Sequence, residues 1–467
     1  MKAVITVLVA LATLILAAGP VSAAKVKYSH QEYFEHYEGT VTCLECHEDE
    51  AEDFFHSQHY QWRGDSPNIV NADGQRLGKM NTMNDFCTNP LPSWIGNAVN
   101  EDGKVIAQGC SKCHAGLGLK PEPELSQKQL ENIDCLICHA AGYRRDAYQD
   151  DDGNWAWKPI LWKNQRGMDS VSKRITLPKR KFCLRCHSGA GGGPNFKRGD
   201  IEYILADCDT DYDVHMAADG NDMDCAECHG DQGHRMRGRG VDLAGTDNPD
   251  NPLSCTSCHD ARPHDVAILD GHTDKVDCSV CHIPTFARTD ATDMVRDWSV
   301  PKYHPEANKY SATITFGQEV EPVYAWFNGD TRLNLMGEKI EANDDGVVPI
   351  MAPQGDRKDD DSRLHAFKLH RGKLPVLKKE QWLVPIAVDE FFVDGDIHKA
   401  VLEGAEMAYG IHDADYEWVE VERYMGIFHG VRPADKALGC LDCHGEQGRL
   451  DWKGLGYKED PLAKQFD

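Results

Sequence analysis

The longest run of apolar positions in this chain lies at its N-terminus, where a basic start precedes a largely apolar stretch over residues 3–18. Gly19 and Pro20 end the run, and small residues follow as far as Ala24. This order is typical of a cleaved secretory signal. A retained membrane anchor is the alternative, but such an anchor needs about 20 apolar residues and this run is shorter. We therefore expect residues 1–24 to be a signal peptide and the mature protein to be exported and soluble.

Downstream of this run the apolar pattern is weak. Helical spacing is clearest over residues 396–410, whereas alternating strand patterns are sparse and short. Stretches rich in Gly and Asp predict surface loops at residues 150–154, 242–251 and 356–361. No later stretch is apolar enough to cross a membrane, so we expect no stable membrane insertion.

Composition and charge narrow the picture. Hydrophobic residues make up 41% of the 467 positions, which is little apolar material for a chain of this length, so another group must fill part of the interior. The formal net charge is −26. This charge argues against nucleic acid as a partner, because phosphate binding needs clustered Lys and Arg.

The cysteines carry the strongest signal. The chain has 18 cysteines, and 16 of them fall into eight Cys-x-x-Cys-His units. The units are Cys43-Cys46-His47, Cys110-Cys113-His114, Cys135-Cys138-His139, Cys183-Cys186-His187, Cys225-Cys228-His229, Cys255-Cys258-His259, Cys278-Cys281-His282 and Cys440-Cys443-His444. Only Cys87 and Cys208 lie outside them.

This unit matches the chemistry of covalent haem attachment. Two thiols three residues apart add to the two vinyl groups of one porphyrin, and the next residue places its imidazole under the iron. Zinc ribbons pair their Cys-x-x-Cys units without a histidine after each one, and disulfide hairpins leave the eight histidines unexplained. The sequence therefore predicts eight covalently bound c-type haems, each with its iron on the histidine of its unit.

The attachment units are unevenly spaced, which excludes a solenoid of fixed period. Seven lie between Cys43 and His282, and the eighth comes only at Cys440. We expect a haem-rich region over residues 25–290, followed by a C-terminal region over residues 291–467 with helices, distal ligands and the eighth unit. The predicted fold class is mainly α with extensive irregular chain, a multihaem cytochrome c fold whose core is a packed chain of haems.

The remaining histidines are candidates for the sixth ligands of these irons. The chain has 22 histidines, of which eight belong to the attachment units, and 14 remain. A haem with two axial histidines is closed and transfers electrons, whereas an open or weakly closed iron can do chemistry. For each candidate the alternative is a surface or hydrogen-bonded imidazole. The candidates are His59, His215, His234, His264, His272, His365 and His429. Seven candidates for eight irons leave one haem over.

The order of these motifs resembles the octahaem tetrathionate reductase family over nearly the whole mature chain. The stretches that carry the resemblance are Asn84-Asp85-Phe86-Cys87, Ile133–His139, Gly191–Lys197, Asp213–Met216, Cys281–Arg288 and Asp435–Cys440. In that family the second haem in chain order is the catalytic one, a lysine ligates its iron, and a free cysteine lies beside it.

Carried over by position, the resemblance implies a catalytic haem on Cys110 and Cys113 with His114 as its proximal ligand. Lys197 would be the lysine ligand, and Cys87 the nearby thiol. A lysine binds iron only when its amine is neutral, so the pocket must hold the lysine pKa down. The alternative for Lys197 is an ordinary solvated side chain, since nearly all lysines are exposed.

Two features depart from the family pattern. The segment over residues 88–109 is longer than the family usually has, which would reshape access to the second haem. Cys208 is an additional cysteine, and in an oxidising compartment it could pair with Cys87 as a structural disulfide. Such a bond would remove the thiol from the site.

The resemblance implies a periplasmic reductase. Electrons from a redox donor, such as a small cytochrome or a quinol-linked membrane cytochrome, would pass along bis-histidine haems to the Lys197 haem. The small inorganic substrate would be tetrathionate, nitrite or hydroxylamine. A periplasmic wire of eight closed haems is the second hypothesis, and an enzyme that oxidises hydroxylamine or a related nitrogen species is the third. A bis-histidine second haem would favour the wire over the reductase.

Overall fold

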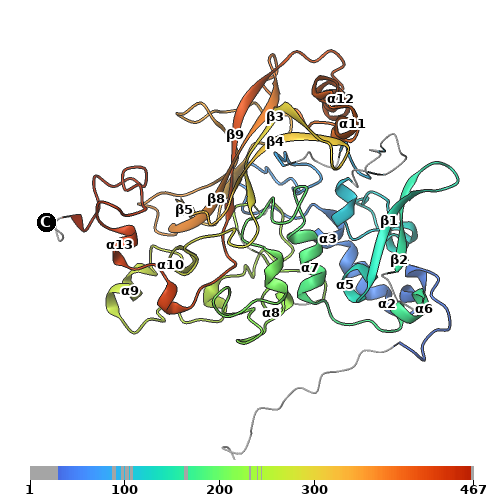
Figure 1. The fold of residues 1–467 in the computed structure, drawn as a ribbon, viewed down its shortest axis with the longest axis horizontal. Helices are drawn as coiled ribbons and strands as arrows, with labels where there is room; N and C mark the ends of the chain where they lie inside the picture. The colour runs from blue at the N-terminus through green and yellow to red at the C-terminus, as the bar shows by residue number, and fades with distance from the viewer. Residues whose placement is uncertain are drawn as a thin grey trace, which may run out of the picture.

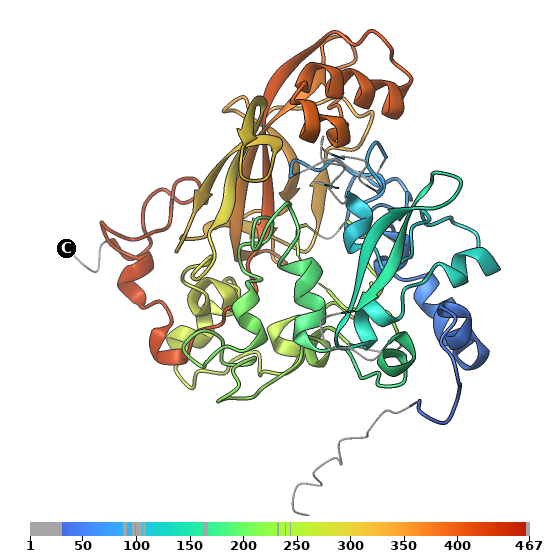
Figure 2. The ribbon, with the colours of Figure 1, turned by 45° about the vertical axis from the view of Figure 1, so that its right-hand side comes forward.

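The computed structural model describes residues 30–86, 91–95, 99, 105, 109–161, 167–230, 233–238, 240–242 and 244–463. Both views show a large sheet at one end of the molecule (Figure 1 and Figure 2). Short helices and irregular chain that carry the attachment units lie at the other end. The predicted signal peptide falls outside the described residues.

The large sheet has seven strands in the order β4-β3-β8-β9-β7-β6, with β5 paired to β8. Most neighbours are antiparallel, but β3 runs parallel to β8 and β7 runs parallel to β9, so the sheet is mixed. The strands are β3 (Thr292–His304), β4 (Lys309–Gly317), β5 (Val323–Phe327), β6 (Thr331–Leu333), β7 (Val348–Pro353), β8 (Arg363–Leu377) and β9 (Tyr416–Gly426). A separate hairpin pairs β1 (Tyr143–Gln149) with β2 (Trp155–Leu161).

This sheet shows that the predicted fold class was wrong, because the chain is not mainly α and its strands are neither sparse nor all short. The whole sheet comes from residues 292–426, between the seventh and eighth attachment units. Its alternation was hidden because interior positions of the long strands carry charged side chains. Lys368 and His370 of β8 and Asp293 of β3 are completely buried. A hydrophobic pattern cannot reveal a strand whose buried positions are ionised.

The helices are short and many coincide with attachment units. The α-helices are α2 (Thr40–Phe55), α3 (Gln58–Gln61), α4 (Gln127–Glu131), α5 (Leu136–His139), α6 (Met168–Ser172), α7 (Arg180–His187), α8 (Cys225–His229), α9 (Ala267–His272), α10 (Cys278–His282), α11 (Val388–Asp394), α12 (Ile397–Tyr409) and α13 (Cys440–Cys443). The 3-10 turns are η1 (Cys110–Cys113), η2 (Tyr203–Ala206), η3 (Cys255–Ser257) and η4 (Ala434–Lys436). Within the described ranges, none of these helices has both the length and the apolar character needed to span a bilayer.

The helix predicted over residues 396–410 is confirmed as α12. The Asp396 side chain caps its first turn by accepting a hydrogen bond from the Lys399 amide. Gly410 ends it with φ at 68°, a left-handed conformation that glycine adopts without strain. Buried residues of α11 and α12, among them Phe391 and Val401, pack with strand residues such as Trp298 in the main apolar core of the sheet.

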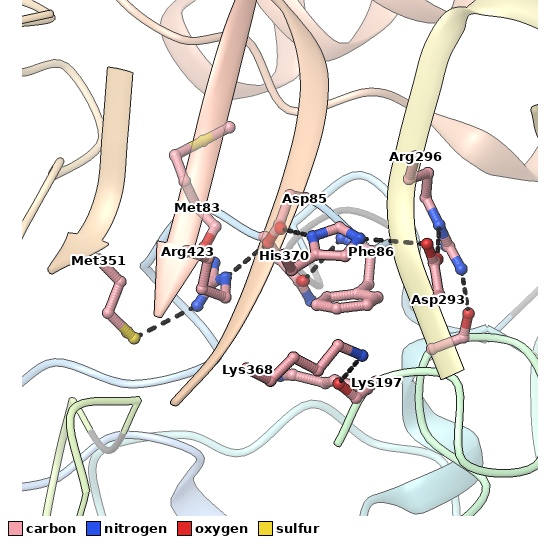
Figure 3. A network of polar contacts seen from close by, with 12 residues as sticks. Met83, Asp85, Phe86, Lys197, Asp293, Arg296, Met351, Lys368, His370 and Arg423 are labelled. Atoms are coloured by element: carbon pink, nitrogen blue, oxygen red, sulfur yellow. Dashed lines mark hydrogen bonds and ion pairs between the residues drawn. The ribbon is translucent and has the colours of Figure 1, made fainter. Parts of the chain in front are cut away.

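A chain of buried charges crosses the sheet (Figure 3). Asp85 accepts hydrogen bonds from Arg423 Nε at 2.6 Å and from His370 Nδ1. Asp293 accepts from His370 Nε2 at 3.2 Å and from Arg296 Nε at 2.7 Å. Both ring nitrogens of His370 face carboxylates, so both carry protons and the ring is cationic. The five charges therefore alternate in sign from one arginine to the other, and each has a partner.

This network holds the segment that precedes the second attachment unit. Arg423 also donates to the Met83 carbonyl at 2.7 Å, and the Trp298 indole donates to the Asp85 carbonyl at 2.8 Å. Phe86 stacks on His370 with ring centroids 4.0 Å apart. Residues 83–86 are thus fixed to the sheet by backbone, ring and ionic contacts together.

We predict that Asp85→Asn lowers the free energy of unfolding by about 3–5 kcal/mol, because it leaves Arg423 and His370 buried without their shared anion. The measurement is guanidinium denaturation followed by far-ultraviolet circular dichroism at pH 7. Asp151→Asn, in the exposed turn between β1 and β2, is the matched control and should change stability by less than about 0.5 kcal/mol. Equal stability of both variants would contradict the role of the network.

The stabilisation that Asp85 provides should depend on pH. Burial alone would raise the pKa of Asp85, but the charges of Arg423 and His370 hold that pKa well below its ordinary value. The stabilisation is therefore fully present above the unfolded-state pKa of about 3.9 and is lost as the pH falls below it. The difference between the wild type and Asp85→Asn should shrink in the same acidic range.

Candidate haem cavity and second attachment site

A large cavity lies in the region that holds the attachment units. Its volume is about 2800 Å³, and both cysteines and the histidine of seven units line it. Of the second unit, Cys113 lines the cavity and His114 does not. A space of this size, bordered by the groups that attach and ligate haem, fits the cofactor predicted from the sequence.

Seven pairs of histidine rings face each other in this region. Each pair joins one attachment histidine to one histidine from elsewhere in the chain. The centroid distances are 6.0 Å for His30–His47, 6.3 Å for His139–His234, 6.1 Å for His59–His187, 6.0 Å for His229–His429, 5.9 Å for His215–His259, 6.2 Å for His264–His282 and 6.4 Å for His272–His444.

These distances suit two imidazoles on one metal ion. A ring nitrogen lies about 2 Å from the metal that it ligates, and the ring centre lies about 1 Å farther, so the two centres are roughly 6 Å apart. Within the described residues, the structure therefore holds seven histidine pairs, each of which could hold one haem iron.

Further hydrogen bonds fix the ring orientations in several pairs. His272 donates from Nδ1 to the Ile268 carbonyl at 2.7 Å. His444 Nδ1 lies 2.7 Å from the Asp460 carboxylate. A partner on Nδ1 leaves Nε2 for the metal and sets the plane of the ring.

Six of the seven candidate distal histidines lie in these pairs, and His365 does not. His365 is completely buried on β8, 3.8 Å from Asp277 and with its ring centroid 5.3 Å from that of Phe327, and it does not line the cavity. His30, which is not among the sequence candidates, faces His47. Sequence reasoning missed His30, because no local motif distinguishes it from an ordinary polar residue near the N-terminus.

The attachment units form a row with one side branch. In the haem-bearing protein these cysteines would supply the thioether sulfurs. Thiols lie close together between the first and third, the second and fourth, the fourth and fifth, and the sixth and seventh units; the pairs are Cys43–Cys135, Cys113–Cys186, Cys183–Cys225 and Cys255–Cys278. Between the third and fourth, the fifth and sixth, and the seventh and eighth units, a cysteine of one unit lies close enough to add to the effect of burial and raise the pKa of a cysteine of the other.

The second unit differs from the other seven. His114 is completely buried and packs against the rings of Tyr60, Trp62 and Trp94 at centroid distances of 5.0, 5.5 and 5.0 Å. Its Nε2 donates to the Tyr60 carbonyl at 2.7 Å, and burial lowers its pKa to about 3. Among the described residues, no other histidine ring is paired with His114. This unit is the one that the histidine count left over.

Lys197 is half-buried and lines the cavity, and, beyond the effect of burial, Lys79 lies close enough to both Lys197 and His114 to lower the pKa of each. The Lys197 Nζ lies 5.9 Å from the ring centroid of Phe86, and the Lys197 pKa is lowered to about 7, first by burial and then by the charges of Lys79 and Arg423. A buried lysine with a lowered pKa can present a neutral amine. The glycine-rich loop holds it closely: at Gly191, where φ is +90°, an added Cβ would lie 3.1 Å from the Lys197 amide nitrogen.

Lys368 is a site residue that sequence reasoning missed (Figure 3). It is completely buried on β8, and its Nζ donates to the carbonyls of Phe196 and Lys197 at 3.0 and 2.9 Å and to Thr292 Oγ1 at 2.6 Å. These three acceptors satisfy all of its donors. Lys368 thereby anchors the backbone from which the Lys197 side chain projects.

The two cysteines outside the attachment units are placed unequally. Cys87 lies outside the described residues. Cys208 is buried in a cluster with Leu184 and Leu205, and burial raises its pKa to about 11. It has no disulfide partner within the part of the chain that the structure describes.

Comparison with known proteins gives three matches. A crystal structure of an octahaem cytochrome c from Shewanella oneidensis has a TM-score of 0.74 and 27% identity, and the match covers 95% of this chain and 96% of that one. The model of the family described as "Cytochrome c bacterial" matches residues 293–447. An uncharacterised protein from Archaeoglobus fulgidus is 32% identical over 241 residues, which are 44% of this chain and 77% of that protein.

These matches agree with the chemistry of the cavity at a coarse level. The octahaem neighbour shares the fold over nearly the full length of both chains, so it supports covalent c-type haem and a redox or electron-transfer function. None of the three descriptions names a substrate. The chain belongs to the same family as the Archaeoglobus protein, and it is a multihaem cytochrome of the c type.

Proposed function

We propose that this protein is an exported, periplasmic octahaem reductase whose second haem is the catalytic one. The observation that carries the proposal is the contrast between the units. Within the described residues, seven attachment histidines each face a second histidine at 5.9–6.4 Å, whereas no histidine faces His114, and, beyond the effect of burial, Lys79 lowers the pKa of both His114 and the half-buried Lys197. We assign electron transfer to the seven sites with two histidines each and the chemical reaction to the one site that differs.

The proposed ligand set follows from the pairs. His47, His139, His187, His229, His259, His282 and His444 are the proximal ligands, and their distal partners are His30, His234, His59, His429, His215, His264 and His272. His30 joins this set and His365 does not. By resemblance, His114 would be the proximal ligand of the second haem, which requires its Nε2 to leave the Tyr60 carbonyl, with Lys197 as the distal ligand and Cys87 as the nearby thiol.

Bound haems would store several electrons and supply them in quick succession, as the reduction of tetrathionate, nitrite or hydroxylamine requires. The residues of this chain hold the site and set its charge. Trp62 lines the cavity and the Phe86 ring lies 5.9 Å from Lys197 Nζ, so apolar surface borders the site and strengthens the electrostatic interactions beside it. Arg198 is fixed beside Lys197 by Asp200 at 3.1 Å.

The resemblance to the octahaem tetrathionate reductase family supports tetrathionate, nitrite and hydroxylamine as substrates, with a small cytochrome or a quinol-linked membrane cytochrome as donor. The order of the attachment units supports electron delivery to the second haem through the fourth, since Cys113 contacts Cys186.

A second function is favoured by the seven histidine pairs themselves. Haems closed on both sides are typical of electron carriers, and a periplasmic wire needs no open iron. The two functions differ only at the second unit, where a carrier would need a ligand that closes the iron permanently.

We predict eight haems per chain. The intact mass of the purified protein should exceed that of its processed polypeptide by eight haems, and a pyridine haemochrome assay should give the same number. Cys440→Ser together with Cys443→Ser should reduce the count to seven, whereas Cys208→Ser should leave it at eight. A polypeptide without covalent haem would contradict the assignment of the units.

We predict that His30→Ala converts one low-spin haem to a high-spin haem that binds carbon monoxide when reduced, because His47 loses its partner across the iron. His365→Ala is the matched control: it removes an equally large buried ring but no ligand, so the ligation spectrum should not change. Electron paramagnetic resonance and absorption spectroscopy measure both. A new high-spin signal in His365→Ala alone would show that His365, and not His30, is a distal ligand.

We predict that tetrathionate, nitrite or hydroxylamine reoxidises the fully reduced protein rapidly without oxygen, and that Lys197→Met slows this reaction about 10–100-fold through loss of a metal ligand. Stopped-flow absorption follows the reaction. Lys302→Met, on the exposed part of β3, controls for the loss of a lysine. If none of the three substrates reoxidises the wild type faster than it reoxidises a bis-histidine carrier, the wire is the better account.

A further inference from the structure

The charges beside Lys197 are not all compensated. Three further cationic side chains line the cavity near it: Lys79, Arg198 and Arg423. Arg423 is paired with Asp85 at 2.6 Å, and Arg198 is paired with Asp200 and Asp242 at 3.1 and 2.5 Å. Within the described ranges, no carboxylate lies within ion-pair distance of Lys79.

Lys79 is placed beside the second unit by its contacts with Trp62. Its Nζ lies 4.4 Å from the Trp62 ring centroid, and that ring packs edge-on against His114 at 5.5 Å. The chain follows the indole closely: a Cβ at Gly78 would lie 2.2 Å from the Trp62 carbonyl oxygen, and the Met80 amide donates to the same oxygen at 3.2 Å. The half-buried amine of Lys79 is therefore fixed over an aromatic wall of the cavity.

The position of Lys79 has an electrostatic consequence. Burial is the largest cause of the lowered pKa of Lys197, and the charge of Lys79 is the second largest. The two amines therefore lie close enough to repel each other. A cation beside apolar walls interacts with a nearby charge more strongly than it would in water. The protein as a whole has a formal net charge of −26 and repels anions at long range. An uncompensated cation in the cavity would reverse that field locally.

We propose that Lys79 is an anion-binding residue that makes the second site prefer small inorganic anions to neutral substrates. This inference rests on the proposed function, in which the second haem is catalytic, and it names the substrate class as anionic. Nitrite and tetrathionate gain from the Lys79 charge as they approach the site. Hydroxylamine is neutral near pH 7 and gains nothing from it.

The test is a pair of binding titrations on the haem-loaded protein. Azide is the anionic probe of the oxidised protein, and carbon monoxide is the neutral probe of the reduced protein; both are followed by absorption spectroscopy. Lys79→Met keeps the apolar stem over Trp62 and removes the charge. It should weaken azide binding roughly tenfold and flatten its dependence on salt, with a carbon monoxide affinity within about twofold of wild type. Lys79→Arg should restore azide binding, and Lys302→Met should match the wild type.

Several results would overturn the inference. They are an azide affinity unchanged in Lys79→Met, an equal loss for both probes, or a wild type that binds no azide at the second site. Because these titrations need no turnover, they separate the two proposals. Azide binding that depends on Lys79 in a protein that reduces no substrate would refute the reductase and leave the anion site standing. In an active protein, a ratio of nitrite to hydroxylamine rates that does not fall in Lys79→Met would refute Lys79 alone.

Discussion

Two imidazole rings that share one metal ion must face each other with their centres roughly 6 Å apart, and most of this molecule is organised around that distance. Seven times the chain brings an attachment histidine opposite a second histidine, and the partner is often remote in sequence, as with His229 and His429. Long irregular segments are the result, because their course is set by the ring that each must deliver. The chain has too few apolar side chains to fill its own interior. The cavity of about 2800 Å³ between the rings is the space that they leave.

The sheet serves a different purpose from the row of histidine pairs. Its strands β3, β8 and β9 carry a buried chain of alternating charges that ends on both sides at an arginine, and this chain holds residues 83–86 in place. Lys368 of β8 holds the backbone of Lys197 from the same wall. The second unit, which faces no second histidine among the described residues, thus follows a chain segment that buried ion pairs hold to the sheet. A site for chemistry needs fixed surroundings more than a site for electron transfer does.

Local chemistry made the attachment units and α12 predictable, because each is defined by residues close together in sequence. Six of the histidines that face attachment histidines were among the sequence candidates, but only contacts between distant parts of the chain reveal that His30 faces His47 and that His365 packs beside Phe327. The sheet was missed for a physical reason: Lys368, His370 and Asp293 occupy buried strand positions, and their charges conceal the apolar alternation. The role proposed for Lys79 was equally hidden, since among the described residues Arg198 and Arg423 are paired with carboxylates and Lys79 is not.

The second attachment unit meets the row at the fourth unit and not at either end, since Cys113 contacts Cys186. Two arms therefore converge on it, a short one through the third and first units and a long one through the fifth to the eighth. Loss of the haem from an outer unit would shorten one arm and leave the other connected. Electron delivery to the second unit would then weaken and not stop. Damage at the fourth unit would isolate the second from both arms. Substitutions around Cys183, Cys186 and His187, where the two arms meet, should therefore impair electron delivery to the second unit most.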